Sequence, residues 1–301
     1  MRRVAPRALA RQAGFTLIEM MVAMAIGLAV IGALISAYLV SFKSGRHTDA
    51  MVQITEDATL ALNVMRQQVA QAGFSQAHGV SEGGGLVTHA FPAIAGCEAA
   101  NFVDLQVGIL VPANCRPADP DQATPDALEV AYEGSVLAGP ASNGILGGPG
   151  IKQPLDCLGN SFAKTHDDTT GDDFWLNDSK FYVADGSLWC HGPGNAAGAA
   201  VVQNVETLQI TYGMAAAPAG SPGAGQIIYY DVAPHPGSPL WANVLSVNLC
   251  VQVRSALKVL DKAQSPTLGG WVDCRNVRRT SADGYLRRTF STTIVLQNKL
   301  L

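Results

Sequence analysis

The sequence contains none of the short motifs that usually mark a catalytic or metal centre. Its six histidines form no His-x-x-x-His pair, its six cysteines form no Cys-x-x-Cys pair, and it has neither a Gly-x-Ser-x-Gly elbow nor a phosphate-binding loop. We therefore expect no enzymatic activity, no cofactor and no bound metal. An acidic stretch at residues 166–173 holds four carboxylates and could bind calcium, but it lacks the EF-hand spacing, so a solvated acidic loop is the preferred interpretation.

Positive charge is also scarce. The chain has 20 lysines and arginines against 24 acids, and four of the basic residues lie in the first 14 residues, which contain no acid: Arg2, Arg3, Arg7 and Arg11. Beyond residue 14 the balance is 16 to 24, a net charge of −8, and the basic residues are scattered except for Arg278-Arg279 and Arg287-Arg288. The sequence therefore predicts no nucleic-acid partner.

Proline is absent between Phe15 and Phe91, and residues 15–42 form an apolar run with one formal charge, Glu19. As a helix this run would reach about 42 Å, against a membrane hydrocarbon core of about 30 Å. It exceeds the apolar region of an ordinary signal peptide, which has about 7 to 15 residues. With the arginines in front of it, the positive-inside bias predicts a single membrane span with a cytoplasmic N-terminus and an exported remainder.

Glu19 needs an explanation, because a carboxylate within a membrane costs about 2.5 to 3.5 kcal/mol. One interpretation is that its side chain snorkels to the nearby interface. The other is that the chain is cut between Gly14 and Phe15, which would place a new α-ammonium group one helical turn before Glu19.

Apolar residues at three- and four-residue steps extend the helix beyond the membrane run, through residues 43–73. They are Ala50, Met51, Ile54, Ala58, Ala61, Leu62, Met65, Val69 and Ala72. Because Gly73 is a natural helix C-cap, we expect one helix from residue 15 to about residue 72. Its apolar stripe needs a cover, for which a β-sheet is the first choice and a coiled-coil partner the second.

The rest of the chain, residues 74–301, is predicted to form one globular head with a mainly antiparallel sheet. Strands are expected at residues 127–133 and 244–254, where apolar and polar residues alternate, and a hairpin at 181–190 turns at Asp185-Gly186. Weaker patterns predict strands at 102–110, 207–214, 226–231 and 288–297. No βαβ alternation occurs, so the fold class is α+β.

Six cysteines follow the membrane run: Cys97, Cys115, Cys157, Cys190, Cys250 and Cys274. An even number in an exported domain predicts disulfides. Although six cysteines allow 15 pairings, we prefer sequence neighbours, 97 with 115, 157 with 190 and 250 with 274, because they close compact loops. Free buried thiols are the alternative.

The N-terminal residues resemble the type III signal of type IV prepilins: an arginine-rich leader, Gly14, then Phe15-Thr16-Leu17-Ile18-Glu19 and an apolar helix. The resemblance implies that a prepilin peptidase removes residues 1–14 and methylates the new N-terminus at Phe15. It also implies that Glu19 pairs with the terminal amine of a neighbouring subunit during assembly.

Further stretches extend the resemblance to the minor type IV pilins of the PilW family. They are Gln71-Ala72-Gly73-Phe74, residues 205–213, Trp241-Ala242-Asn243-Val244 and residues 287–298. The resemblance implies a pilin-like fold and a low-abundance pilin of the inner membrane and then the pilus. Its implied partners are other minor pilins, the major pilin, the inner-membrane assembly machinery and, before assembly, membrane lipid. Its implied role is in a complex that primes pilus assembly and sits at or near the tip, supporting motility or adhesion.

Two alternatives remain open at this stage. A minor pseudopilin of type II secretion would share the signal and the domain plan. A membrane-anchored periplasmic binding or enzymatic domain belongs to a different functional class, and a specific ligand or turnover by the purified domain would favour it.

Overall fold

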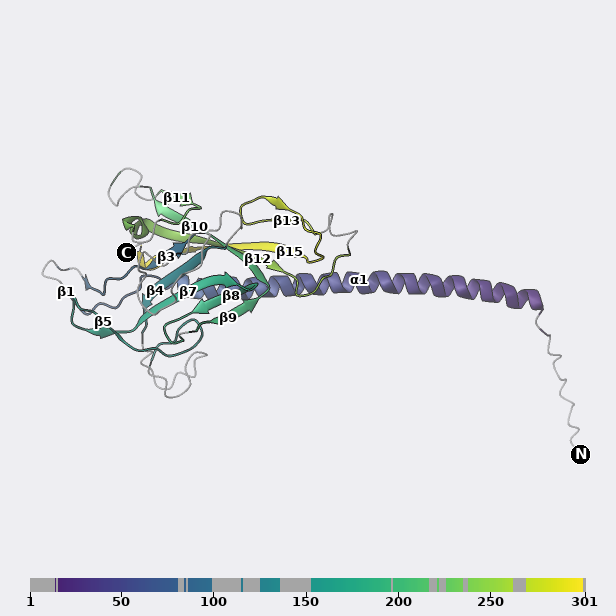
Figure 1. Ribbon diagram of the computed structural model, residues 1–301, viewed down its shortest axis with the longest axis horizontal. Coiled ribbons are helices and arrows are strands. Elements are labelled where there is room, and N and C mark those ends of the chain that lie inside the picture. Colours follow the sequence, from purple (N-terminus) through teal and green to yellow (C-terminus); the bar gives the residue numbers. More distant parts are fainter. Residues whose placement is uncertain are drawn as a thin grey trace, which may run out of the picture. The chain divides into compact units, whose positions relative to one another are not determined.

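The computed structural model describes residues 14, 16–80, 84, 86–98, 115, 125–135, 153–195, 197–216, 221, 226–234, 238–261 and 269–299 (Figure 1). Phe15 and the strand predicted at 102–110 lie outside these residues. The chain divides into two compact units, Met1–Asp49 and Ala50–Leu301. We call the second unit the head.

One helix, α1, covers Leu17–Val69. Within the head its buried residues are Ala50, Ile54, Ala58, Ala61, Met65 and Val69, which is the apolar stripe expected from the sequence. The helix ends three residues before the predicted position, and a turn then leads to Gly73, whose φ of +74° suits glycine. A side chain at this position would also bring its Cβ within 2.9 Å of the Ala93 Cβ.

A five-stranded antiparallel sheet has the order β3-β4-β7-β8-β9. Its strands are β3 (Ile94–Cys97), β4 (Ala127–Glu133), β7 (Leu176–Ala184), β8 (Ser187–His191) and β9 (Ala199–Gln203). The β7–β8 hairpin turns at Asp185 and Gly186, whose φ angles are +49° and +68°, as a type I′ turn requires. The hairpin and β4 match their predictions, whereas β3 and β9 were not predicted.

A four-stranded antiparallel sheet has the order β11-β10-β12-β15. Its strands are β11 (Ile227–Tyr230), β10 (Val205–Ala215), β12 (Val244–Arg254) and β15 (Arg287–Val295), all near their predicted positions. Short ladders pair β1 (Gly79–Val80) with β2 (Leu86–Val87), β5 (Thr165–His166) with β6 (Asp173–Phe174), and β13 (Trp271–Val272) with β14 (Arg278–Arg279). Two 3-10 turns, η1 (Pro239–Asn243) and η2 (Gln297–Lys299), complete the described elements.

The sequence suggested one sheet, but the described head has two principal sheets, and both contribute to one core with α1. Ile54, Met65, Leu128, Phe181, Leu208 and Leu249 all belong to this core. A single residue, Asn204, separates β9 from β10, and its φ of +63° allows the sharp change of direction. The Asn204 Nδ2 donates to Asp57 Oδ2 of α1 at 3.2 Å, so this junction is also attached to the helix.

Both faces of β4 are buried, including the face that carries Glu129. Glu129 on β4 lies opposite Lys180 on β7. The Lys180 Nζ donates to Asp178 Oδ2 at 2.8 Å and lies 3.4 Å from Glu129 Oε1, and all three residues are at most 3% exposed. Burial is the main cause that raises the pKa of Glu129 well above its usual range, so at neutral pH this residue is protonated.

Three disulfides join sequence neighbours: Cys97 to Cys115, Cys157 to Cys190, and Cys250 to Cys274. The second fastens the loop before β5 to β8, and the third fastens the β13–β14 hairpin to β12.

Candidate functional site

The first turn of α1 is closed by reciprocal hydrogen bonds between Thr16 and Glu19. The backbone N–H and the hydroxyl of Thr16 donate to Glu19 Oε2 at 2.9 and 3.1 Å, and the backbone N–H of Glu19 donates to Thr16 Oγ1 at 3.3 Å. This is a capping box, in which the side chains at the first and fourth positions satisfy each other's backbone N–H groups. The Thr-x-x-Glu spacing before an apolar run is the sequence signal of this motif.

Gly14, the residue expected before the cleavage point, is exposed and lies outside regular structure. A peptidase needs an extended, accessible segment, and the position of Gly14 just before the helix is compatible with that need. The structure therefore places Gly14 and Glu19 on either side of the start of α1, while Phe15 lies outside the described residues.

The N-terminal half of α1 has an unusually exposed apolar surface. From Leu17 to Phe42, sixteen large apolar side chains are each more than half exposed, among them Leu17, Met24, Leu28 and Leu34. This stretch is long and apolar enough to cross a membrane. A side-chain surface of this kind is stable only in lipid or against other apolar helices.

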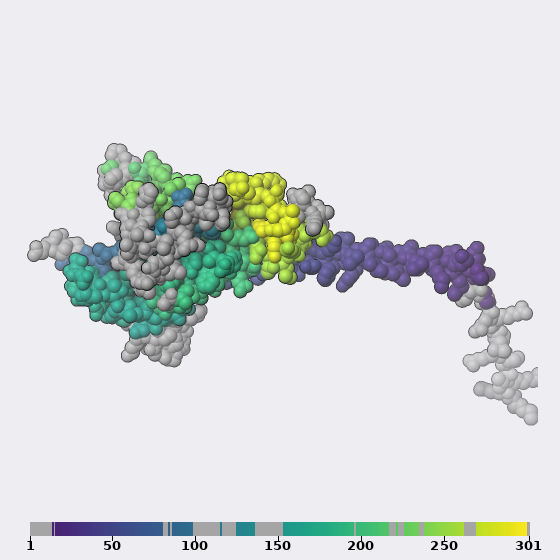
Figure 2. All heavy atoms as spheres, in the orientation of Figure 1, coloured from purple at the N-terminus to yellow at the C-terminus, as the bar shows by residue number. Residues whose placement is uncertain are grey.

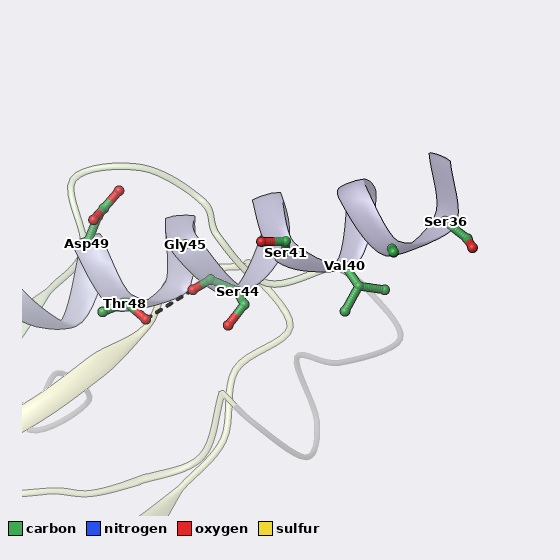
Figure 3. A pocket seen from close by; sticks show the side chains of 8 residues that line it. Ser36, Val40, Ser41, Ser44, Gly45, Thr48 and Asp49 are labelled. Carbon is green, nitrogen blue, oxygen red and sulfur yellow. Dashed lines mark hydrogen bonds between the residues drawn. The ribbon is translucent and has the colours of Figure 1, made fainter. Parts of the chain in front are cut away.

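Small side chains follow the apolar surface and line one side of α1 from Ser36 to Asp49 (Figure 3). They are Ser36, Ala37, Ser41, Ser44, Gly45 and Thr48, with Val40 between them. The Thr48 hydroxyl donates to the carbonyl oxygen of Ser44 at 3.1 Å, so its polar group is satisfied within the helix. Small residues at these spacings allow another helix to approach closely.

The acidic stretch at residues 166–173 forms the end of the β5–β6 hairpin. Asp167 is tied to His89, whose Nδ1 lies 2.6 Å from Asp167 Oδ2, and this hydrogen bond is the main cause that lowers the pKa of Asp167. The His89 ring also stacks on Phe174 and lies at a tilt against the ring of His78, and no sequence pattern indicated these contacts. Across the described part of the chain, no group of three or more potential ligands is arranged to hold a metal ion.

Taken together, an arginine-rich segment before a capped helix, an exposed apolar half-helix and a disulfide-bonded α+β head are the features of a type IV pilin-like protein. Residues 9–35 match the family model of the prokaryotic N-terminal methylation motif, and residues 174–298 match that of type IV pilus-assembly protein W. The N-terminus therefore matches the prepilin signal and the C-terminal part of the head is similar to PilW, and the two matches together support a minor pilin of type IV pilus assembly.

Solved structures that match the chain include a type IV-like pilin from Thermus thermophilus, with 12% identity and a TM-score of 0.37, covering 82% of this chain and 98% of that one. The GspK-GspI-GspJ complex of the enterotoxigenic Escherichia coli type 2 secretion system also matches, with 10% identity and a TM-score of 0.23, covering 78% of this chain and 97% of that one. No curated protein sequence matches the chain.

Proposed function

We propose that this minor pilin acts in the complex that primes pilus assembly, at or near the pilus tip, and so supports pilus-dependent motility or adhesion. The observation that carries the proposal is the exposed apolar surface of α1 from Leu17 to Phe42. It needs lipid before assembly and neighbouring helices after it. The pilin family supports a structural rather than a catalytic protein.

In the proposed sequence of events, the chain first crosses the inner membrane once, with residues 1–14 in the cytoplasm and the head in the periplasm. The four leader arginines support this orientation. A prepilin peptidase then cuts between Gly14 and Phe15 and methylates Phe15. The membrane half of α1 is finally transferred from lipid into a bundle of pilin helices by the inner-membrane assembly machinery.

Glu19 is proposed to guide this transfer by accepting the terminal ammonium group of a neighbouring subunit. Its carboxylate is already close to the cut, and one of its oxygens, Oε2, accepts both hydrogen bonds from Thr16. A carboxylate has two oxygens with about four acceptor positions, so it can keep its own cap and still receive a neighbour's ammonium.

The experiment is cross-linking of the full-length protein in its native membrane, followed by purification and identification of its neighbours by mass spectrometry. The proposal expects other minor pilins as the main neighbours, together with the major pilin. Recovery of secretion-system subunits without minor pilins would contradict it. Recovery of major pilin alone, along the whole filament, would contradict the position at the tip.

A further inference from the structure

Positive charge gathers in one part of this acidic protein. Residues 254–299 contain nine lysines and arginines and three aspartates, whereas the chain as a whole has more acids than bases. Five of these basic residues, all arginines, lie between residues 275 and 288. Part of this C-terminal region, yellow in Figure 2, is exposed at the surface of the head. Such a local reversal of charge is typical of a binding surface for an anion.

The centre of this area is the β13–β14 hairpin, which is held rigidly. Its turn is closed by Asp273, which accepts hydrogen bonds from the backbone N–H groups of Arg275 and Val277 at 3.0 and 2.8 Å. Three further links attach the hairpin to the four-stranded sheet: the Cys250–Cys274 disulfide, a hydrogen bond of 2.7 Å from Trp271 Nε1 to Gln252 Oε1, and one of 2.8 Å from Thr289 Oγ1 to the Val272 carbonyl.

Two pockets lie at this hairpin and share Trp271 as a wall. The first, with a volume of about 290 Å³, is enclosed by Thr207, Gln209, Gln252, Trp271, Asp273, Cys274, Arg275 and Arg279. The second, of about 380 Å³, is lined by Gly270, Trp271, Val272, Arg278, Arg288 and Thr289. The first volume is at the lower end of the range for small-molecule sites, about 300 to 1,000 Å³.

The two arginines of the first pocket have guanidinium N–H groups that can donate hydrogen bonds to a ligand. Arg275 donates through Nε to Gln209 Oε1 at 3.0 Å, and Arg279 donates through Nε to Asp273 Oδ2 at 2.8 Å. Within the described residues, the terminal guanidinium nitrogens of these two arginines donate no hydrogen bond. The side chain of Arg278, beside the second pocket, makes no hydrogen bond or ion pair to any described residue.

Arg287 differs from these arginines, because its charge is neutralised by two carboxylates and its side chain supports the Trp271 ring. Its guanidinium donates to both carboxylate oxygens of Glu206 and of Asp283 and lies 4.9 Å from the Trp271 ring centroid. This contact fixes the indole ring. Arg279 forms an ion pair with Asp273 at 2.8 Å, so the uncompensated charge comes from Arg275 at the first pocket and from Arg278 at the second.

We propose that the β13–β14 hairpin forms a binding site for an acidic saccharide, a sugar unit that carries a carboxylate, sulfate or phosphate group. The free ends of Arg275 and Arg279 would hold the anionic group, for which the planar guanidinium is well suited. Thr207 and Asp273 offer hydrogen bonds to hydroxyl groups, and Trp271 offers an apolar wall. The proposal does not depend on a position at the pilus tip.

A saccharide fits these residues better than a nucleic acid does. Proteins that bind single strands use several aromatic side chains in a row along a basic groove, because successive bases stack on them. The first pocket has one aromatic residue, and the net charge of −8 beyond residue 14 repels a long polyanion. A compact unit with one anionic group avoids that repulsion.

The test uses the full-length protein in detergent micelles and isothermal titration with galacturonate, with galactose, which lacks the carboxylate, as the neutral comparison. We expect the acidic saccharide to bind and the neutral one to bind at least about tenfold more weakly, since a hydrogen bond to a charged group is worth about 1.5 to 3 kcal/mol. Equal binding of the two, or no binding of the acidic one, would overturn the proposal.

Two variants locate the site. Arg275→Gln removes a guanidinium, and Gln209→Glu places a carboxylate where it can pair with Arg275, so that each should weaken binding about tenfold or more. Arg66→Gln, an equal change on the exposed side of α1, should leave binding unaltered. Circular dichroism checks that the variants fold, and Gln209→Glu keeps the test valid if Arg275→Gln unfolds the hairpin. Equal affinity of the Gln209→Glu variant and the wild type, or tighter binding of a single-stranded oligonucleotide, would show that the assignment is wrong.

Discussion

Thr16 and Glu19 cap the first turn of α1 reciprocally, through hydrogen bonds of 2.9, 3.1 and 3.3 Å. Glu19 therefore has two separable properties, the shape of a capping side chain and a negative charge. The proposed assembly step needs the charge, whereas the helix start needs only an acceptor. This separation allows the two roles to be tested with different substitutions.

The first prediction is that Glu19→Gln and Glu19→Leu are both cleaved but both fail to join the pilin complex. Glutamine can still accept the cap bonds, but neither residue can neutralise a neighbour's ammonium, and an unpaired buried charge costs about 3 to 5 kcal/mol. Leader removal is followed on a gel and incorporation in sheared pili. Thr16→Val, which removes the hydroxyl and keeps the carboxylate, is the matched control and should assemble. If Glu19→Gln assembles like the wild type, assembly needs the capping hydrogen bonds of residue 19 and not its negative charge.

The second prediction concerns processing. Replacing Gly14 with valine puts a branched side chain in front of the proposed cut, where the peptidase is expected to accept only glycine. We expect an uncut precursor in the inner membrane, seen by mass spectrometry as a chain that retains residues 1–14. A wild-type protein whose N-terminus is anything other than methylated Phe15 would refute the signal assignment.

The third prediction is that the three disulfides exist in the exported protein and stabilise the head. In the loop-entropy model each closed loop contributes about 3 to 4 kcal/mol. Non-reducing peptide mapping should recover linked peptides for Cys97 with Cys115, Cys157 with Cys190 and Cys250 with Cys274. Free thiols at Cys250 and Cys274 in the folded protein would contradict this pairing.

The fourth prediction uses the buried group at Glu129, Asp178 and Lys180. Because burial keeps Glu129 protonated, Glu129→Gln should change the free energy of unfolding by less than about 1 kcal/mol. Lys180→Met should cost about 3 to 5 kcal/mol, since it leaves the buried Asp178 carboxylate without its ammonium partner. The free energies of unfolding of both variants are measured with denaturant. A larger loss of stability for Glu129→Gln than for Lys180→Met would contradict a protonated Glu129 beside a charged Asp178.

The fifth prediction concerns acid stability. Hydrogen bonds from Arg287 are the main cause that lowers the pKa of Asp283 to about 2, from about 3.9 in an unfolded chain. The stabilisation is therefore complete above pH 4 or so and is lost as the pH falls toward about 2. Asp283→Asn should be less stable than the wild type at neutral pH, and the two should converge in acid. Asp231→Asn, at an exposed site, should lower stability by less than about 0.5 kcal/mol.

Much of this architecture is readable from the sequence because its signals are local. The stripe of Ala50, Ile54 and Met65 has helical spacing, and Asp185-Gly186 supplies the backbone angles of its hairpin. Each of these features depends on neighbours a few residues away. The same holds for the leader arginines and the position of Glu19.

What the sequence did not indicate depends on residues far apart along the chain. The burial of Glu129 depends on the other elements that surround β4, and the contact of His89 with Asp167 joins residues 78 apart. The two pockets around Trp271 arise because a disulfide folds the β13–β14 hairpin over β10 and β12. Arg278-Arg279, expected at the surface, is indeed exposed, but only the fold brings these arginines near Trp271.

The attachment of α1 inside the head determines how the head responds to a pulling force. The side chain of Asn298 donates to the carbonyl oxygens of Gln71 and Ala72 beyond the last helical turn, and Asn204 holds Asp57 nearer the other end of the buried stripe. A pulling force along the helix axis would have to break the contacts between these two anchors at the same time. It could not break them one after another. The head is therefore built to stay attached to its helix while a filament is under load.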